Sequence, residues 1–128
     1  MPEEDDCVER SNRQAICRML AELFALWKLS DNECLAVFGL PQEEFAVLIG
    51  LRNSDPTVLS PALLERAGHL LGIHRNLRRL FPQNRDLAYA WMKTSNRAFN
   101  DFTPIDHIGK SGLAGLRTVR NYLDAAQG

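Results

Sequence analysis

Apolar residues recur along this chain at intervals of three and four positions, which places them on one side of an α-helix. The first such run predicts a helix over residues 9–28, with an apolar face formed by Ile16, Met19, Leu20, Leu23, Leu26 and Trp27. A longer run predicts a helix over residues 60–81, with an apolar face formed by Leu63, Ala67, Leu70, His74, Leu77 and Phe81. Alternating runs of Val, Ile and Thr are missing, so the pattern predicts an all-α fold.

Capping signals mark where the shorter helices begin and end. Ser30 and Glu33 have the spacing of a capping box, and Gly39 suits the left-handed residue that follows a helix end. Pro41 suits the first turn of a third helix, which we expect to reach Leu51. The inward-facing side chains predicted for this helix are Phe45, Leu48 and Ile49.

Prolines and glycines punctuate the second half of the chain. Ser60-Pro61 begins the long helix and Pro82 ends it. After it we expect a helix over residues 86–92, a loop, a short helix from Thr103-Pro104 to Ile108, a break at residues 109–112 and a last helix over residues 113–126.

Polar residues between positions 52 and 60 are typical of a linker. The expected organisation is therefore a disordered acidic tail over residues 1–8, a helix-turn-helix-like domain over residues 9–59 and a small helical domain over residues 60–128. With 128 residues, 45% of them apolar, the chain is long enough for one compact unit or two sub-domains that share a core.

Cysteine usage and hydropathy indicate a reduced, cytoplasmic protein. Cys7, Cys17 and Cys34 form no CxxC pair, and the last two fall within helical patterns where cysteine acts as a small apolar residue. The acidic N-terminus has no apolar stretch of the kind found in signal peptides. No apolar run approaches the roughly 20 residues of a membrane-spanning helix, so no membrane partner is expected.

The net charge of −1 conceals an uneven distribution. Residues 1–64 carry 11 acidic and 5 basic residues, whereas residues 65–128 carry 5 acidic and 10 basic ones. Halves of opposite sign can attract each other within a dimer or face different partners. Two solvated faces are the simpler alternative.

Residues 31–51 form a candidate helix-turn-helix. Gly39-Leu40 supplies the glycine of the turn and the apolar residue that packs the second helix. The second helix begins with Glu43-Glu44, whose carboxylates would face the DNA phosphates. The alternative is a helical scaffold or a dimer contact. The nearby residues suited to DNA are Gln42 and Arg52.

Four arginines cluster near the end of the long helix: Arg75, Arg78, Arg79 and Arg85. They could contact nucleic acid or an acidic protein surface. Solvated arginines that complement the helix dipole are the simpler interpretation.

The chain offers little chemistry for catalysis. His69 and His74 are five positions apart, unlike the pair of a zinc helix, and His74 is expected to be a hydrogen-bonded core histidine. Ser111 has no evident activating base, and no glycine-rich phosphate cradle appears. We therefore expect no enzyme activity, no metal and no cofactor.

The last forty residues carry a distinctive pattern. It reads W-x4-N-x2-F-x4-P-x7-G-x3-L-x2-V-x3-L and consists of Trp91, Asn96, Phe99, Pro104, Gly112, Leu116, Val119 and Leu123. This pattern resembles the toxin-binding domain of Xre/MbcA/ParS-type antitoxins, and the preceding helices resemble the helix-turn-helix part of that family. The chain departs from the family by having Asn100-Asp101-Phe102 where a glycine often precedes the Thr-Pro pair, and by its acidic second helix.

The resemblance implies a docking role for this segment. Trp91 and Phe99 can supply contact area or belong to the core, as can Leu116 and Val119, and Asn96 can hold the loop through its side-chain amide. Residues expected to point toward solvent would then contact the toxin. The toxin-binding residues expected overall are Trp91, Asn96, Phe99, Pro104, Lys110, Gly112, Arg117, Arg120, Asn121 and Tyr122.

The function implied is that of an antitoxin in a bacterial type II toxin–antitoxin pair. The partner implied is a RES-domain toxin that consumes NAD⁺, whose active site the C-terminal helices would cover. The resemblance also implies a homodimer within a larger complex, and operator DNA as a second partner in autorepression. The alternative is a stand-alone helix-turn-helix transcriptional regulator whose C-terminal part serves for dimerisation.

Overall fold

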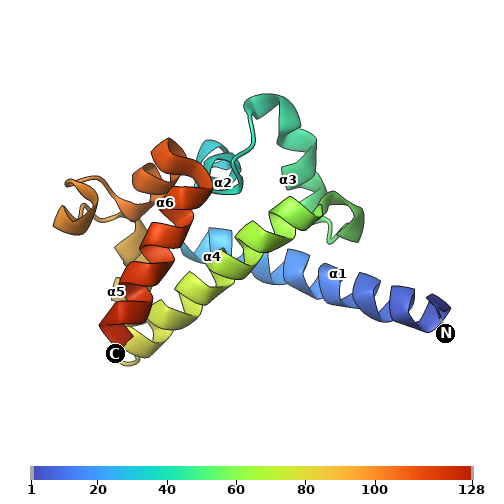
Figure 1. Ribbon diagram of the computed structural model, residues 1–128, viewed down its shortest axis with the longest axis horizontal. Helices are drawn as coiled ribbons and strands as arrows, with labels where there is room; N and C mark the ends of the chain where they lie inside the picture. The colour runs from blue at the N-terminus through green and yellow to red at the C-terminus, as the bar shows by residue number, and fades with distance from the viewer. Residues whose placement is uncertain (1, 128) are drawn as a thin grey trace.

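The computed structural model describes the backbone of residues 2–127 and the side chains of residues 8–127 (Figure 1). This part of the chain contains helices and no strand, which confirms the predicted all-α fold. Its α-helices are α1 (Pro2–Leu26), α2 (Asp31–Phe38), α3 (Phe45–Arg52), α4 (Pro61–Leu80), α5 (Arg85–Ala90) and α6 (Pro104–Gln127). Its 3-10 helices are η1 (Gln42–Glu44), η2 (Pro56–Val58), η3 (Trp91–Lys93) and η4 (Arg97–Phe99).

The caps predicted at Ser30, Gly39 and Ser60 are present, whereas Pro41 precedes the 3-10 helix η1 and does not lie in the first turn of α3. Ser30 Oγ accepts a hydrogen bond from the Glu33 N–H at 3.1 Å, and the Glu33 carboxylate accepts one from the Ser30 N–H at 2.8 Å. Gly39 follows α2 with a φ of 68°, a conformation that glycine adopts without steric cost. Ser60 caps α4, where its Oγ accepts from the Leu63 N–H at 3.2 Å.

The first helix begins earlier than expected. α1 starts at Pro2, so the residues predicted as a disordered tail form its first turns, apart from Met1, which lies outside the described residues. Proline is tolerated in a first helical turn because its missing N–H would have no partner there. In Figure 1 this end of α1 projects away from the other helices.

Three expected core positions are wrong. Met19, Phe45 and Ile49 were predicted to face inward but are 46%, 37% and 46% exposed. In α3 the buried side chains are instead Leu48 and Leu51. All residues of α3 except Arg52 are apolar or glycine, so spacing alone does not identify the face that packs on α1.

Both predicted sub-domains contribute to one hydrophobic cluster that includes Trp27, Phe38, Leu70 and Leu116. The long segments of α4 and α6 lie side by side and run in the same direction (Figure 1). Their register follows from two contacts, Arg117 with Glu65 near the start and Asp124 with Asn76 near the end.

α6 is two helical segments joined at one residue. Gly112 has φ 62° and ψ −139°, whereas the residues on either side are helical. The break predicted over residues 109–112 is therefore confined to Gly112. The first segment packs against α2, where Gly109 approaches Ala36, and the second follows α4.

Cys17 and Cys34 are free thiols, 0% and 1% exposed, in agreement with their predicted apolar role. Burial raises the pKa of Cys34 to about 11, so this thiol stays protonated at neutral pH. The Cys7 side chain lies outside the described residues.

Within the described chain no single helix is long and apolar enough to cross a membrane. α2 and the segment Gln42–Arg52 reach that length and composition only when taken together across a 100° bend.

Candidate functional site

Four aromatic rings meet where η3, η4 and α6 come together, and we call Trp91, Phe99, His107 and Tyr122 the aromatic cluster. Tyr122 stacks on Trp91 with ring centroids 6.1 Å apart, and Phe99 meets both rings edge-on at 6.2 and 5.4 Å. His107 stacks on Phe99 at 5.1 Å. Phe99 is 2% exposed and Trp91 is partly buried, so both rings belong mainly to the core, whereas Tyr122 is 43% exposed.

Asn96 closes the loop that presents this cluster. Its side-chain oxygen accepts from the Ala98 N–H at 2.9 Å, as predicted for a residue that holds loop backbone. Its backbone N–H donates to the Phe102 carbonyl, and its own carbonyl accepts from the Asp101 N–H, both at 3.1 Å. Asn100 and Asp101 have φ of 56° and 66°, so both adopt the left-handed conformation just before Phe102 and the Thr-Pro pair. Asn and Asp tolerate this conformation better than most residues.

Thr103 and Pro104 set the start of α6. Thr103 Oγ1 accepts from the Asp106 N–H at 3.1 Å, and its carbonyl accepts from the His107 N–H at 2.9 Å. Pro104 is buried in the first turn, where proline needs no hydrogen-bond partner. Thr103-Pro104 and Gly112 therefore set the two directions of α6 and do not themselves present an exposed surface.

Four exposed residues lie on the elements that carry the aromatic cluster: Phe102 and Lys110, which contact each other, and Asn121 and Tyr122, which are neighbours in α6. We call these four residues together the docking face. Phe102 is 39% exposed, and the Lys110 ammonium lies 4.1 Å from its ring centroid in a cation–π contact. The Phe102 N–H donates to the Phe99 carbonyl at 3.0 Å, which ties this end of the face to the cluster. Phe102 was missed in the sequence because its loop has no helical periodicity.

Arg117 and Arg120, predicted to face the toxin, reach toward α4. Arg117 forms an ion pair with Glu65 at 2.6 Å, and both side chains are about half exposed. Arg120 is partly buried and lies across Gly72, with a nitrogen 3.2 Å from Nδ1 of His69. These two residues therefore fasten α6 to α4, whereas Lys110 lies over the Phe102 ring in the first segment of α6.

Asn76 is a second link between α4 and α6 that periodicity did not reveal. It is 5% exposed, and its side-chain amide donates to Asp124 at 2.7 Å. Its carbonyl accepts from the Gln127 side chain at 2.8 Å. The end of α6 is thus held by polar contacts, in addition to the buried Leu116, Val119 and Leu123.

Two histidines of α4, His69 and His74, have lowered pKa values. Burial, followed by the charge of Arg120, lowers the pKa of His69, and burial, followed by Arg78, lowers the pKa of His74. His74 stacks on Tyr89 at 6.1 Å, but its buried Nδ1 has no hydrogen-bond partner, so the predicted hydrogen-bonded core histidine is wrong. No group of three metal-binding side chains is found in the described part of the chain.

The structure places the two helices of the candidate helix-turn-helix at a steep angle to each other. α2 and the segment Gln42–Arg52 meet at 100° across the turn at Gly39, within the usual range for this motif. Its polar residues are engaged locally, because Gln42 donates to Asn32 at 3.1 Å and Arg52 pairs with Asp31 at 2.5 Å. Glu43 and Glu44 are exposed at the start of this segment, so carboxylates occupy the end that would approach DNA.

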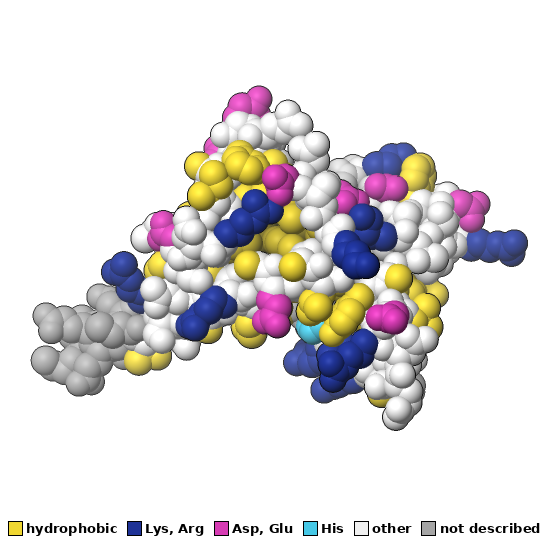
Figure 2. Space-filling view, turned by 180° about the vertical axis from the view of Figure 1, so that it is seen from behind, with side chains coloured by type: hydrophobic (Ala, Val, Ile, Leu, Met, Phe, Trp, Pro, Cys, Tyr) yellow, Lys and Arg dark blue, Asp and Glu magenta, His cyan; other side chains and the backbone are white. Residues whose placement is uncertain are grey.

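The basic group surrounds the C-terminal end of α4. Arg75, Arg79 and Arg85 are exposed, and Arg78 is partly buried and donates to the Tyr89 hydroxyl at 3.1 Å. At the lower right of Figure 2, basic side chains gather beside a histidine and a run of hydrophobic side chains. This surface differs from the docking face and borders a hollow lined by His74, Arg78 and Arg85.

Comparison with known proteins finds a family match for the C-terminal segment. Residues 76–128 match the family described as the antitoxin Xre/MbcA/ParS C-terminal toxin-binding domain. The chain is also 28% identical over 102 residues to the uncharacterized protein y4oB of Sinorhizobium fredii (strain NBRC 101917 / NGR234), a match that covers 80% of this chain and 76% of that protein. No solved structure matches the chain.

Proposed function

We propose, from the premise that residues 76–128 are an Xre/MbcA/ParS toxin-binding domain, that this antitoxin neutralises a RES-type, NAD-consuming toxin by covering its active site with the C-terminal helices. The chain would be the antitoxin of a bacterial type II pair. The family resemblance supports the RES type of the partner. The observation that carries the docking role is the exposed face of Phe102, Lys110, Asn121 and Tyr122 within the matched segment.

Rigid aromatic side chains with part of their surface exposed are well suited to protein contacts, because little conformational entropy is lost on binding. Tyr122 meets this description, since its ring is held by Trp91 and Phe99 and remains 43% exposed. The matched segment carries eight basic and four acidic residues, so its net charge of +4 suits a partner surface that carries carboxylates.

The test is co-expression with the toxin-sized product of the adjacent gene, read out by growth rescue and by co-purification. Deleting residues 113–128 would remove buried Leu116, Val119 and Leu123 and so unfold the domain, which makes surface variants the better probe. We expect Lys110→Glu combined with Asn121→Glu to weaken binding at least tenfold.

The matched control is Asn12→Glu combined with Arg18→Glu, two exposed positions on α1. It should bind as the wild-type chain does, and thermal unfolding should show that both double variants are folded. The antitoxin proposal would be refuted if the product of the adjacent gene neither inhibits growth nor binds the wild-type chain.

A second candidate function is transcriptional regulation by the free chain, favoured by the 100° crossing of the helix-turn-helix-like unit. In the antitoxin the same unit would serve autorepression by a homodimeric complex. Either role requires DNA binding through the segment that contains Gln42 and Arg52, against the charge of Glu43 and Glu44.

Gel-shift titration with the promoter DNA of the operon, at several salt concentrations, tests this function. Binding led by phosphate contacts weakens steeply as salt rises, because condensed counterions are released on binding. Glu43→Gln with Glu44→Gln should then strengthen binding, and Gln42→Ala should weaken it. Absence of a shift with the free chain and with the toxin complex would exclude regulation.

A further inference from the structure

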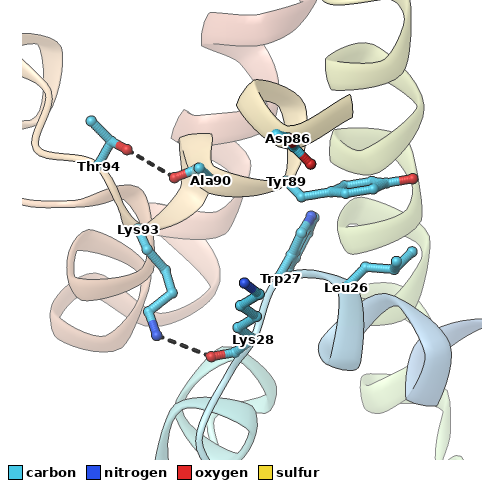
Figure 3. Close-up of a pocket in the computed structure, with 8 residues that line it drawn as sticks. All are labelled: Leu26, Trp27, Lys28, Asp86, Tyr89, Ala90, Lys93 and Thr94. Carbon is cyan, nitrogen blue, oxygen red and sulfur yellow. Dashed lines mark hydrogen bonds between the residues drawn. The ribbon is translucent and has the colours of Figure 1, made fainter. Parts of the chain in front are cut away.

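A groove separate from the docking face runs between α1 and the corner formed by α4 and α5. One hollow of about 530 Å³ lies between Leu26–Lys28 and the side of α5 that carries Asp86, Tyr89 and Ala90 (Figure 3). A second hollow of about 380 Å³ continues along α1 toward Met19 and is bordered by His74. Both hollows are lined by Leu26 and Tyr89, so they form one continuous surface, which we call the α1–α5 groove.

The groove contains three buried polar atoms without a hydrogen-bond partner: Nε1 of Trp27, Nδ1 of His74 and Nε of Arg78. Trp27 is 1% exposed, and the nitrogen-bearing edge of its ring points toward Tyr89 in Figure 3. Indole and guanidinium N–H groups can only donate. Because buried donors are nearly always paired, the unpaired N–H groups of Trp27 and Arg78 indicate a wall at which a bound group supplies acceptors.

The rim of the groove is mainly basic. Lys28, Arg78, Arg85 and Lys93 border it, against the carboxylates of Glu22 and Asp86. The Lys93 ammonium is already held by the Lys28 carbonyl at 3.0 Å and by Glu33 at 3.3 Å. The exposed side chains of Lys28 and Arg85 form no ion pair within the described residues, so they are available to carboxylates of a partner.

The walls of the groove are apolar. Leu26 and Ala90 line the first hollow, Leu23 and Leu71 line the second, and Met19 at its edge is 46% exposed. An apolar lining with a few convergent donors is the usual character of a binding pocket. The groove therefore suits a segment that combines an apolar side chain with neighbouring carboxylates.

We infer that the α1–α5 groove is a second docking site for the toxin, filled by a toxin segment that places an apolar side chain in the hollow and carboxylates at Lys28 and Arg85. This inference rests on the proposed function. It is supported by continuity, because Tyr89 and Ala90 line the groove while the next residue, Trp91, stacks on Tyr122 at the docking face. A toxin that covers the docking face needs only to extend across α5 to reach the groove.

Two variants of the full-length chain test the groove. Ala90→Trp fills the first hollow from an exposed position, and Lys28→Glu with Arg85→Glu reverses the charge of the rim. Matched controls are Ala62→Trp, at an exposed position on α4, and Arg10→Glu with Arg18→Glu, at two exposed positions on α1. In calorimetric titration with the purified product of the adjacent gene, we expect both groove variants to bind at least tenfold more weakly and the controls to stay within twofold.

A second measurement reports on the groove without altering it. The chain has two tryptophans, so the ¹⁵N-labelled protein gives two indole N–H signals, which Trp91→Phe assigns. We expect unlabelled toxin to move the Trp27 signal downfield, as the N–H gains an acceptor.

The outcomes separate this inference from the proposed function. Failure of the wild-type chain to bind the toxin would overturn both. Toxin binding that is weakened by the Lys110 and Asn121 variants but unchanged by both groove variants, with an unmoved Trp27 signal, would overturn the groove site alone. Groove variants that abolish a dimer of the free chain in light scattering, with toxin affinity unchanged, would assign the groove to a second copy and equally overturn the inference.

Discussion

The guanidinium of Arg120 on α6 lies 3.2 Å from Nδ1 of His69 on α4. Because arginine can only donate, His69 must accept through this nitrogen and is therefore neutral, with its proton on Nε2. Arg120 also lies across Gly72, where a side chain would meet its guanidinium at 2.8 Å. The contact between α4 and the second segment of α6 thus depends on a glycine, an unprotonated histidine and an arginine.

Stability should fall as the pH drops from 7.5 to 5.5. The pKa values of His69 and His74 are lowered in the folded chain, chiefly by burial, so the unfolded chain binds protons more readily below about pH 6.5. The contribution of the two neutral histidines to the free energy of unfolding is therefore full at pH 7.5 and is lost as these side chains are protonated. Melting temperatures measured across this window should decrease for the wild-type chain.

His69→Gln combined with His74→Gln should flatten this dependence. Glu33 and Asp55 also have lowered pKa values, but they affect stability only below about pH 4.5, outside this window. The prediction fails if the double variant loses as much melting temperature as the wild-type chain between pH 7.5 and 5.5.

Gly115→Ala should destabilise the chain. A methyl group at this position would lie 2.9 Å from the His107 carbonyl oxygen and 3.2 Å from the Ile108 Cα, and backbone atoms cannot move aside easily. We expect a loss of about 1–3 kcal/mol in the free energy of unfolding, measured in urea. The matched control is Gly109→Ala, whose methyl would lie 3.7 Å from Ala36 and should gain up to about 1 kcal/mol from helix propensity.

Gly112→Ala should also destabilise, for a different reason. No atom crowds this position, but its φ of 62° and ψ of −139° are accessible essentially to glycine alone. The expected cost is about 1–3 kcal/mol of unfolding free energy. Gly68→Ala in α4, with equally open space and helical backbone, should instead stabilise. Equal effects of the two substitutions in urea unfolding would refute the role of backbone conformation.

Asn76 and Asp124 should show an energetic coupling. Their hydrogen bond of 2.7 Å joins a buried amide to a carboxylate, and such bonds contribute about 1.5–3 kcal/mol when buried. Because Asp124 is exposed, we expect a coupling nearer about 1 kcal/mol in a double-mutant cycle with Asn76→Ala and Asp124→Ala. Strict additivity of the two substitutions would exclude a stabilising hydrogen bond.

Local signals in the sequence predicted the helical elements well. The capping box at Ser30, the caps at Gly39 and Ser60 and the loop role of Asn96 depend on hydrogen bonds between neighbouring residues, so a short segment contains all the partners. The C-terminal pattern was recognisable because its residues stand at fixed spacings within one short segment. The match of residues 76–128 to the family confirms that resemblance.

Side-chain directions could not be predicted where a helix is apolar all round or where a polar residue pairs across helices. Phe45 and Ile49 face solvent because α3 packs only its Leu48 side on the core. Arg120 has a solvent-facing position by helical spacing, yet it lies on α4 because the missing side chain of Gly72 leaves room for its guanidinium, which also donates to the Gly68 carbonyl. Nothing within α6 itself indicates that room.

The sequence by itself thus determined the helical class, most helix boundaries and the kind of domain at the C-terminal end, because these follow from contacts within a few residues. Tertiary structure alone decided which residues form the docking face, the tie of Arg117 and Arg120 to α4, and the α1–α5 groove with its unpaired Trp27 nitrogen. Each of these depends on the register between helices distant in the chain, and that register is set by the packing of the whole core.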